Sequence, residues 1–321
     1  MTSVLSRVVA PFAAVAVLVA TLSACGTGPS QVNSAVILGD HVISVDEVQS
    51  LVDKVVKEPA ARSLAQQHKL DLVAREAVSQ LIVHDVLGVV AKREGVKVDQ
   101  DLLSDLRSQN PFDQKLSADS SVPTEQLVPE LVYRARGFDA YANDQLLLDA
   151  LARAHIGRDS ASYSLVSIEN GDEARDLAEK VAANPGDAAS LMRAAAAKAG
   201  AEPQINQDTG QTPDGVYLSA PDNSVFVLPA SQGASGGSGF QVVQVLSTKT
   251  AATMSPDIDL SQVDGSQLPA LGRYVLRPYV MGQDLRISPR YGVWNDVTLT
   301  VVPKNEADVS GFVVRPTSDK S

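Results

Sequence analysis

The chain has 321 residues and a formal net charge of −11 at pH 7. This acidity argues against nucleic acid and anionic lipid as main partners, because both require a positively charged protein surface. With 44% hydrophobic residues the chain can build a core, and its length suggests two domains. Aromatic residues make up only 4% of the sequence, so alanine and valine are expected to provide most of the packing.

The first 24 residues have the features of a secretory signal peptide. Arg7 gives a positively charged start, and residues 8–19 are almost all apolar. The sequence L-S-A-C that ends at Cys25 resembles the lipobox of bacterial lipoproteins, in which the cysteine becomes the first residue and is acylated, for example by palmitate. Cys25 is also the only cysteine of the chain. We therefore expect a protein lipid-anchored through Cys25 on the outer face of the cell membrane, with residues 25–34 as a flexible tether.

Residues 35–157 are expected to be mostly helical. Residues 35–43 are typical of two short strands around a Gly-Asp turn. Ser44 and Glu47 then form a capping box, which predicts a helix to about residue 57.

Three further helices are predicted before residue 157. The longest covers 70–94 and ends at Gly95. A shorter helix, capped by Asp99, runs to about residue 108, and a third long helix extends from Pro123 to about residue 150.

The pattern changes near residue 158 to that of an α+β module that extends to residue 252. An alternating strand is predicted at 162–168, and helices are predicted from Asp172 and Asp187. The module would be completed by a turn-rich stretch at 201–224 and by strands at 225–228 and 240–246.

The last part of the chain, residues 253–303, returns to a helix at 268–276. Residues 304–321 are expected to form a solvated tail.

The segment A-V-I-L-G-D-H-V-I-S-V-D-E-V resembles the opening of the SurA-like chaperone domain, where a short hairpin leads into a capped helix. The segment I-S-P-R-Y-G-V-W also looks like the end of lipoproteins of this group from high-GC Gram-positive bacteria. In this family the helical domain is interrupted by parvulin-type prolyl isomerase domains and completed by a helix after them. The resemblance therefore implies an α+β fold in which a discontinuous chaperone domain, 35–157 with 253–303, carries an inserted parvulin-like domain, 158–252.

The resemblance also points to two positions in the inserted domain. The parvulin site is formed in part by two histidines, one on the first strand and one on the last. S-Y-S-L-V places Tyr163 at the first of these positions, and G-F-Q-V-V-Q-V places Gln241 at the second. Gln241 is then either a polar replacement for an active-site histidine or an edge-strand glutamine that faces solvent. Both interpretations deny the domain an isomerase site.

No other motif predicts a catalytic residue, a cofactor or a metal site. A phosphate-binding loop and a nucleophile elbow are both missing from the sequence. The histidines do not have the spacing of metal ligands, and His84 is expected to be a satisfied, partly buried side chain. The four histidines are His41, His68, His84 and His155.

These features predict a membrane-anchored, chaperone-like holdase that binds unfolded or nascent secreted polypeptides along an apolar groove of its helical domain. Two alternatives stay open: a divergent parvulin-type prolyl isomerase, and a scaffold for one dedicated envelope partner. The scarcity of methionine and aromatic residues counts against the holdase, because promiscuous binding surfaces use them.

Overall fold

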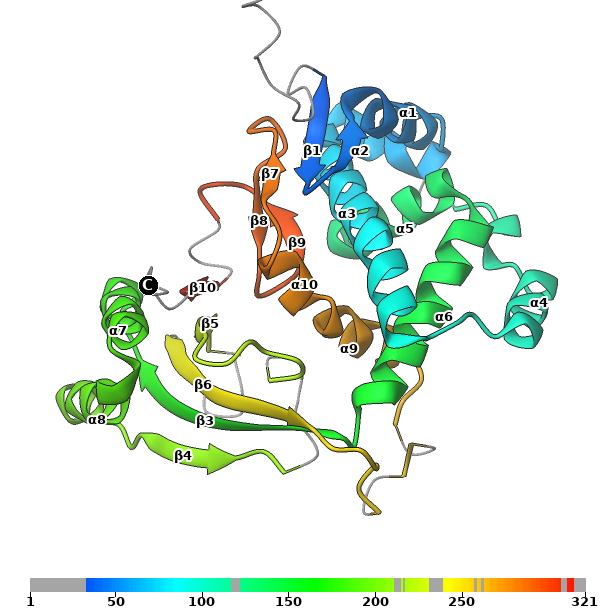
Figure 1. Cartoon of the computed structure of the whole chain (residues 1–321). Coiled ribbons are helices and arrows are strands. Elements are labelled where there is room, and N and C mark those ends of the chain that lie inside the picture. Colours follow the sequence, from blue (N-terminus) through cyan, green and yellow to red (C-terminus); the bar gives the residue numbers. More distant parts are fainter. Residues whose placement is uncertain are drawn as a thin grey trace, which may run out of the picture.

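The structure is a computed structural model that describes residues 33–116, 122–210, 215, 217–230, 239–256, 259–260, 263–306 and 311–314. The chain is α+β, with a mostly helical part and a five-stranded sheet that carries helices (Figure 1). Cys25, the predicted signal peptide and most of the predicted tether lie outside the described residues. Among the described helices, none combines the length and the hydropathy needed to cross a bilayer.

The helical part is built around α3, which packs against α1, α5 and α6. Its side chains supply much of the largest hydrophobic cluster of the protein. The helices of this part are α1 (Val45–Val56), α2 (Arg62–Gln66), α3 (Leu70–Glu94), α4 (Gln100–Ser108), α5 (Thr124–Arg136) and α6 (Phe138–His155), with short 3-10 turns η1 (Pro59–Ala61) and η2 (Pro111–Asp113).

The predicted helix ends are confirmed where a local cap sets them. The amide of Glu47 donates to the Ser44 hydroxyl at 3.0 Å at the start of α1. The carboxylate of Asp99 accepts from two amides of α4, and α3 ends at Gly95, whose φ is 71°. These ends depend on contacts between close neighbours in the sequence, which is why the sequence reveals them.

The single long helix predicted from Pro123 is wrong, because Gly137 divides it into α5 and α6. The backbone of Gly137 has φ 98° and ψ 151°, a combination that is essentially restricted to glycine. The two helices therefore change direction at this residue and pack against each other.

The C-terminal segment returns to the helical part. Strand β7 extends the β1–β2 hairpin into a three-stranded antiparallel sheet, and α9 packs along α6. Residues of both segments share one hydrophobic cluster, which joins Val78 and Leu87 of α3 to Leu276 and Val301. These elements are β1 (Ser34–Leu38), β2 (His41–Ser44), α9 (Leu268–Val275), α10 (Arg277–Met281), β7 (Leu285–Ile287), β8 (Val293–Asn295) and β9 (Thr300–Val302).

The second part is an antiparallel sheet with the strand order β10-β5-β6-β3-β4. Helices α7 and α8 pack on one face of this sheet, where the second hydrophobic cluster lies (Figure 1). The α7 N-cap is Asn170, not the predicted Asp172. The elements are β3 (Asp159–Ile168), α7 (Gly171–Ala183), η3 (Pro185–Asp187), α8 (Ala188–Ala199), β4 (Gln204–Asp208), β5 (Val225–Pro229), β6 (Phe240–Thr250) and β10 (Phe312–Val314).

The prediction of a solvated tail from residue 304 is wrong for residues 312–314, which form β10. Phe312 and Val314 pack against the cluster beneath α7, and the strand pairs with β5. Burial of these two apolar side chains keeps this short segment in the sheet.

The two parts are joined through Arg277, whose side chain is fully buried. Its guanidinium donates to the carbonyl of Asp296 at 3.1 Å and lies 5.1 Å from the ring of Phe226 in β5. Burial lowers the pKa of Arg277 to about 10, so the group stays charged at neutral pH. The cation thus links α10, the β8–β9 hairpin and the sheet.

Candidate functional site

The face of the five-stranded sheet opposite α7 and α8 contains both positions that the resemblance singled out. Gln241 lies on β6, between Ser167 of β3 and Leu228 of β5. Because β6 has a neighbouring strand on each side, the interpretation of Gln241 as an edge-strand residue is wrong. The side chain is partly buried.

Tyr163 lies on the same face, but the register keeps it away from Gln241. It is opposite Val245, whereas Gln241 is opposite Ser167. Four residues of strand therefore separate the two side chains, which is roughly 13 Å at about 3.3 Å per residue. The Tyr163 hydroxyl donates to Gln204 Oε1 at 3.2 Å, and its ring lies 4.6 Å from that of Tyr217. The structure does not bring the two predicted positions into one site.

The other glutamine of the F-Q-V-V-Q-V strand, Gln244, is the more unusual residue, and the family resemblance does not point to it. Gln244 faces the helix side of the sheet and is buried. Its Nε2 lies 3.5 Å from the carbonyl of Pro185, and its Oε1 has no hydrogen-bond partner among the described residues. The sequence indicates this unusual position, because Gln244 follows Phe240 and Val242 at a spacing of two residues and therefore shares their apolar face of the strand.

A histidine, an aspartate and a serine meet where α6 leads into β3. His155 Nδ1 lies 2.9 Å from Asp159 Oδ2, and the Ser219 hydroxyl donates to the same oxygen at 3.2 Å. Thr250 donates to the other carboxylate oxygen at 2.7 Å. Although burial alone raises the pKa of the Asp159 carboxyl, hydrogen bonds from His155, Thr250 and Ser219 hold that pKa below its usual value.

This group has the residue types of a hydrolytic triad but not the geometry. Asp159 and the Ser219 hydroxyl both face Nδ1 of His155, the serine at 3.5 Å. In a triad the aspartate and the nucleophile occupy different ring nitrogens, so that one orients the ring while the other nitrogen accepts the proton. The cavity beside the group, about 490 Å³, is bordered by elements of both parts, α3, β6 and α10. We interpret the group as a structural junction.

Two more histidines form pairs with aspartates in the helical part. His84 Nδ1 of α3 lies 2.7 Å from Asp144 of α6, and Arg136 donates to the other oxygen of Asp144 at 2.7 Å. His41 of β2 lies 2.9 Å from Asp85. The hydrogen bond with Asp144 raises the pKa of His84. These pairs tie neighbouring elements together, and no group of three metal-ligating side chains occurs in the part of the chain that the structure describes.

Four aromatic rings gather at one end of the helical part, around η2 and the start of α6. Phe112 lies 5.5 Å from Phe138 and 5.2 Å from Tyr141, which in turn lies 4.9 Å from Tyr133. The four side chains are partly buried and lie outside the main hydrophobic cluster. Their positions span residues 112 to 141, so no local motif reveals the cluster.

Helix α4 lies beside these rings and exposes two leucines. Arg107 of α4 pairs with Asp139 in the first turn of α6 at 2.8 Å. Leu102 and Leu106, one turn apart, are 48% and 39% exposed, whereas Leu103 is buried. We call α4, η2 and the four rings the α4 end; it combines four partly buried aromatic rings with two exposed leucines on α4.

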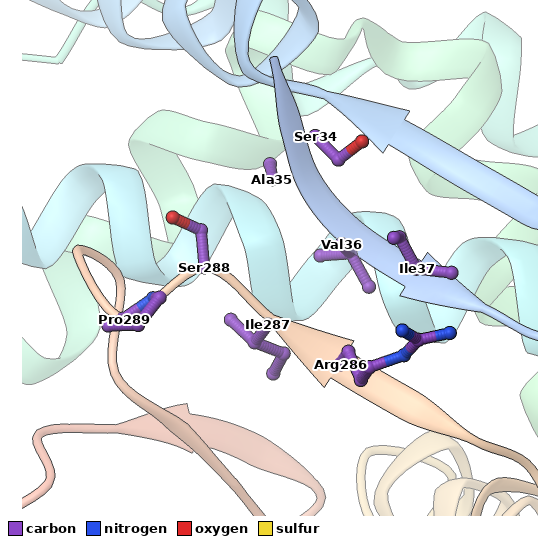
Figure 2. Close-up of a pocket in the computed structure, with 8 residues that line it drawn as sticks. All are labelled: Ser34, Ala35, Val36, Ile37, Arg286, Ile287, Ser288 and Pro289. Carbon is purple, nitrogen blue, oxygen red and sulfur yellow. The ribbon is translucent and has the colours of Figure 1, made fainter. Parts of the chain in front are cut away.

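A second apolar feature is a cavity of about 370 Å³ along β1 and β7. Figure 2 shows the residues that line it, which come from two neighbouring strands and the turn after β7. Arg286 lies near Ile37 at one end, and Ser288 and Pro289 lie at the other. The amide of Ser288 donates to the carbonyl of Ala35 at 2.8 Å, so the backbone here is already paired.

Neither a protein-family model nor a curated protein sequence matches the chain. Solved structures of two foldase proteins are similar to it. PrsA from Lactococcus lactis is 12% identical, with 79% of this chain and 94% of that chain covered and a TM-score of 0.22. PrsA from Streptococcus pneumoniae str. Canada MDR_19A is 15% identical, with 75% and 84% covered and a TM-score of 0.22.

Proposed function

We propose that this protein is a chaperone-like holdase that binds unfolded or nascent secreted polypeptides on the α4 end, and that a lipid on Cys25 holds it at the outer face of the membrane. The observation that carries the proposal is the combination of four partly exposed rings with Leu102 and Leu106. Aromatic and aliphatic side chains on one surface suit clients of varied sequence, because apolar burial is not directional.

The proposal also concerns the organisation of the chain. Residues 35–157 and 253–303 would form one discontinuous chaperone domain, interrupted by the parvulin-like residues 158–252. The shared cluster that joins α3 to Leu276 and Val301 supports this division. A client bound at the α4 end would then contact the same domain that the C-terminal segment completes.

The alternative function is prolyl isomerisation, which would require an active site on the five-stranded sheet. Tyr163 and Gln241 lie on one face but are separated along it, and Tyr163 already hydrogen-bonds Gln204. This arrangement favours binding without catalysis.

The deciding experiment uses the chain from Gly26 onward, without lipid. Suppression of aggregation of an unfolded client and isomerisation of a proline-containing test peptide are measured side by side. Holdase function requires suppression with isomerisation at background. Isomerisation above background would favour the enzyme, and suppression restricted to one client would favour the dedicated scaffold.

A matched pair of variants tests the binding surface. Leu102→Ser with Leu106→Ser should raise the protein concentration needed for half-suppression about 30-fold or more, since the two leucines together contribute on the order of 2–4 kcal/mol of burial. The control is Val56→Ser with Val89→Ser, because these valines are similarly exposed, at 43% and 45%, but lie on α1 and α3. Equal loss in both double variants would contradict binding at the α4 end.

A further inference from the structure

Strand β10 is a short strand near the end of the chain, and it forms one edge of the five-stranded sheet. Its three residues pair antiparallel with β5, with Phe312 opposite Val227 and Val314 opposite Val225. In chain order it follows the β8–β9 hairpin, which belongs to the cluster of the helical part. Figure 1 shows β10 beside β5 and α7. The edge of β5 is therefore covered by a segment that arrives from another part of the fold.

The side chains of β10 occupy apolar positions on both faces of the sheet. Phe312 and Val314 pack on the cluster beneath α7, and Val313 packs on the cluster of the opposite face. The guanidinium of Arg175 from α7 lies 4.2 Å from the ring centre of Phe312. The edge of β5 and α7 thus hold an aromatic residue followed by two aliphatic residues in an extended conformation.

The start of β10 is held by a buried polar side chain. Asn295, which is 4% exposed, donates from Nδ2 to the carbonyl of Gly311 at 2.8 Å, while its Oδ1 accepts from the amide of Val297. This contact recognises a backbone carbonyl and no particular side chain. A chain that lies along β5 with a glycine at the position of Gly311 can offer the same group.

Gly311 makes the attachment of β10 sensitive to substitution. Its φ is 87°, and a Cβ would stand 2.7 Å from the carbonyl oxygen of Val227. Both the left-handed backbone and this close approach exclude a side chain. A single methyl group at residue 311 therefore weakens the pairing without shortening the chain.

From these observations we propose that the β5 edge, α7 and Asn295 form a second client-binding site, and that β10 occupies this site when no client is bound. An extended apolar segment of an unfolded client replaces β10 by pairing with β5. Backbone pairing supplies affinity for many sequences, and the positions of Phe312 and Val314 select apolar side chains at alternate residues. This inference rests on the proposed function only in naming unfolded chains as the partner.

The test uses a fluorescent peptide with the sequence of residues 309–316, V-S-G-F-V-V-R-P. Its binding is measured to the full chain, to Gly311→Ala, and to a chain that ends at Glu306. Gly311→Ala and the shortened chain should bind the peptide at least about tenfold more tightly than the full chain. The reason is that β10, which competes with the peptide for β5, is weakened in the first and absent from the second. A peptide with serine in place of Phe312 and Val314 is the control and should not bind.

An unfolded client should then displace the peptide from Gly311→Ala. The proposal is overturned if the shortened chain and Gly311→Ala both keep native circular dichroism but do not bind the peptide, or if the client leaves it bound. It is also overturned if Gly311→Ala forms dimers in which two copies exchange β10. The peptide measurement does not involve the α4 end, so its failure is distinguishable from a failure of the Leu102 and Leu106 variants.

Discussion

Gly272 of α9 lies directly against the backbone of Leu148 in α6: a Cβ added to the glycine would stand 1.9 Å from the Leu148 carbonyl oxygen. This approach is far closer than any side chain permits. It explains how α9, from the last part of the chain, packs along a helix of the first part.

The first prediction is that Gly272→Ala lowers the free energy of unfolding by several kcal/mol, because α9 must move away from α6. Gly88→Ala, in the interior of α3 with open space around it, is the matched control. It should stabilise the protein by about 0.5–1 kcal/mol, since alanine favours a helix. Urea unfolding of both variants measures the difference, and equal effects would contradict the close approach.

The second prediction concerns Gln241, on the central strand β6. Gln241→Ala should leave suppression of client aggregation unchanged, because the residue lies on β6 and not at the α4 end. It is also remote in register from Tyr163 and, on our proposal, takes no part in catalysis. Isomerisation of a proline-containing peptide should stay at background in both proteins. A rate above background in the wild type that falls in Gln241→Ala would establish an isomerase instead.

The third prediction is a pH dependence from His84. Its hydrogen bond with Asp144 raises its pKa in the folded protein, so the protonated form is favoured by folding. The stabilisation is complete below the unfolded pKa of about 6.5 and is lost as the pH rises through the higher folded pKa. The difference in unfolding free energy between wild type and His84→Ala should therefore be larger at pH 5.5 than at pH 8.5.

His68→Asn is the control for this comparison. His68 has no ion-pair partner within the described ranges, and its φ of 56° suits asparagine. The difference from wild type should change more between the two pH values for His84→Ala than for His68→Asn. An equal change in both variants would contradict a coupling between His84 and Asp144.

The fourth prediction concerns the junction at Asp159. Thr250→Val removes a hydrogen bond of 2.7 Å to its carboxylate and should cost about 1–3 kcal/mol at pH 7. The pKa of Asp159 is lowered in the folded protein, so its contribution is present above the unfolded pKa and is lost as the pH falls through the folded pKa. The cost of Thr250→Val should shrink in acid, as unfolding experiments at pH 7 and pH 3 would show.

The local features of the fold could be predicted from the sequence, since Ser44, Gly95 and Asp99 act on neighbours within one helical turn. Strand β4 could not, because its sequence Q-I-N-Q-D is polar and mostly exposed and gains its conformation only by pairing with β3. The same holds for β10, which depends on a partner strand far away in the sequence.

The candidate site was predictable only in part. Tyr163 and Gln241 could be placed on strands of one sheet, but their separation depends on the register between β3 and β6. The α4 end could not be predicted, because its rings meet through the packing of α5 and α6 around the turn at Gly137. Such ring contacts depend on tertiary packing and leave no periodic pattern in the sequence.

The shared cluster of α3 and the C-terminal segment also sets the order in which the chain can fold. Synthesis delivers α3 first, and α9 follows only after the four strands β3 to β6, roughly 10–35 s later at about 5–20 residues per second. During that interval the apolar stripe of α3 that Leu276 and Val301 later cover has no partner from that segment. During synthesis the nascent chain is thus incomplete and exposes hydrophobic surface. It is then the same kind of molecule that we propose the folded protein binds.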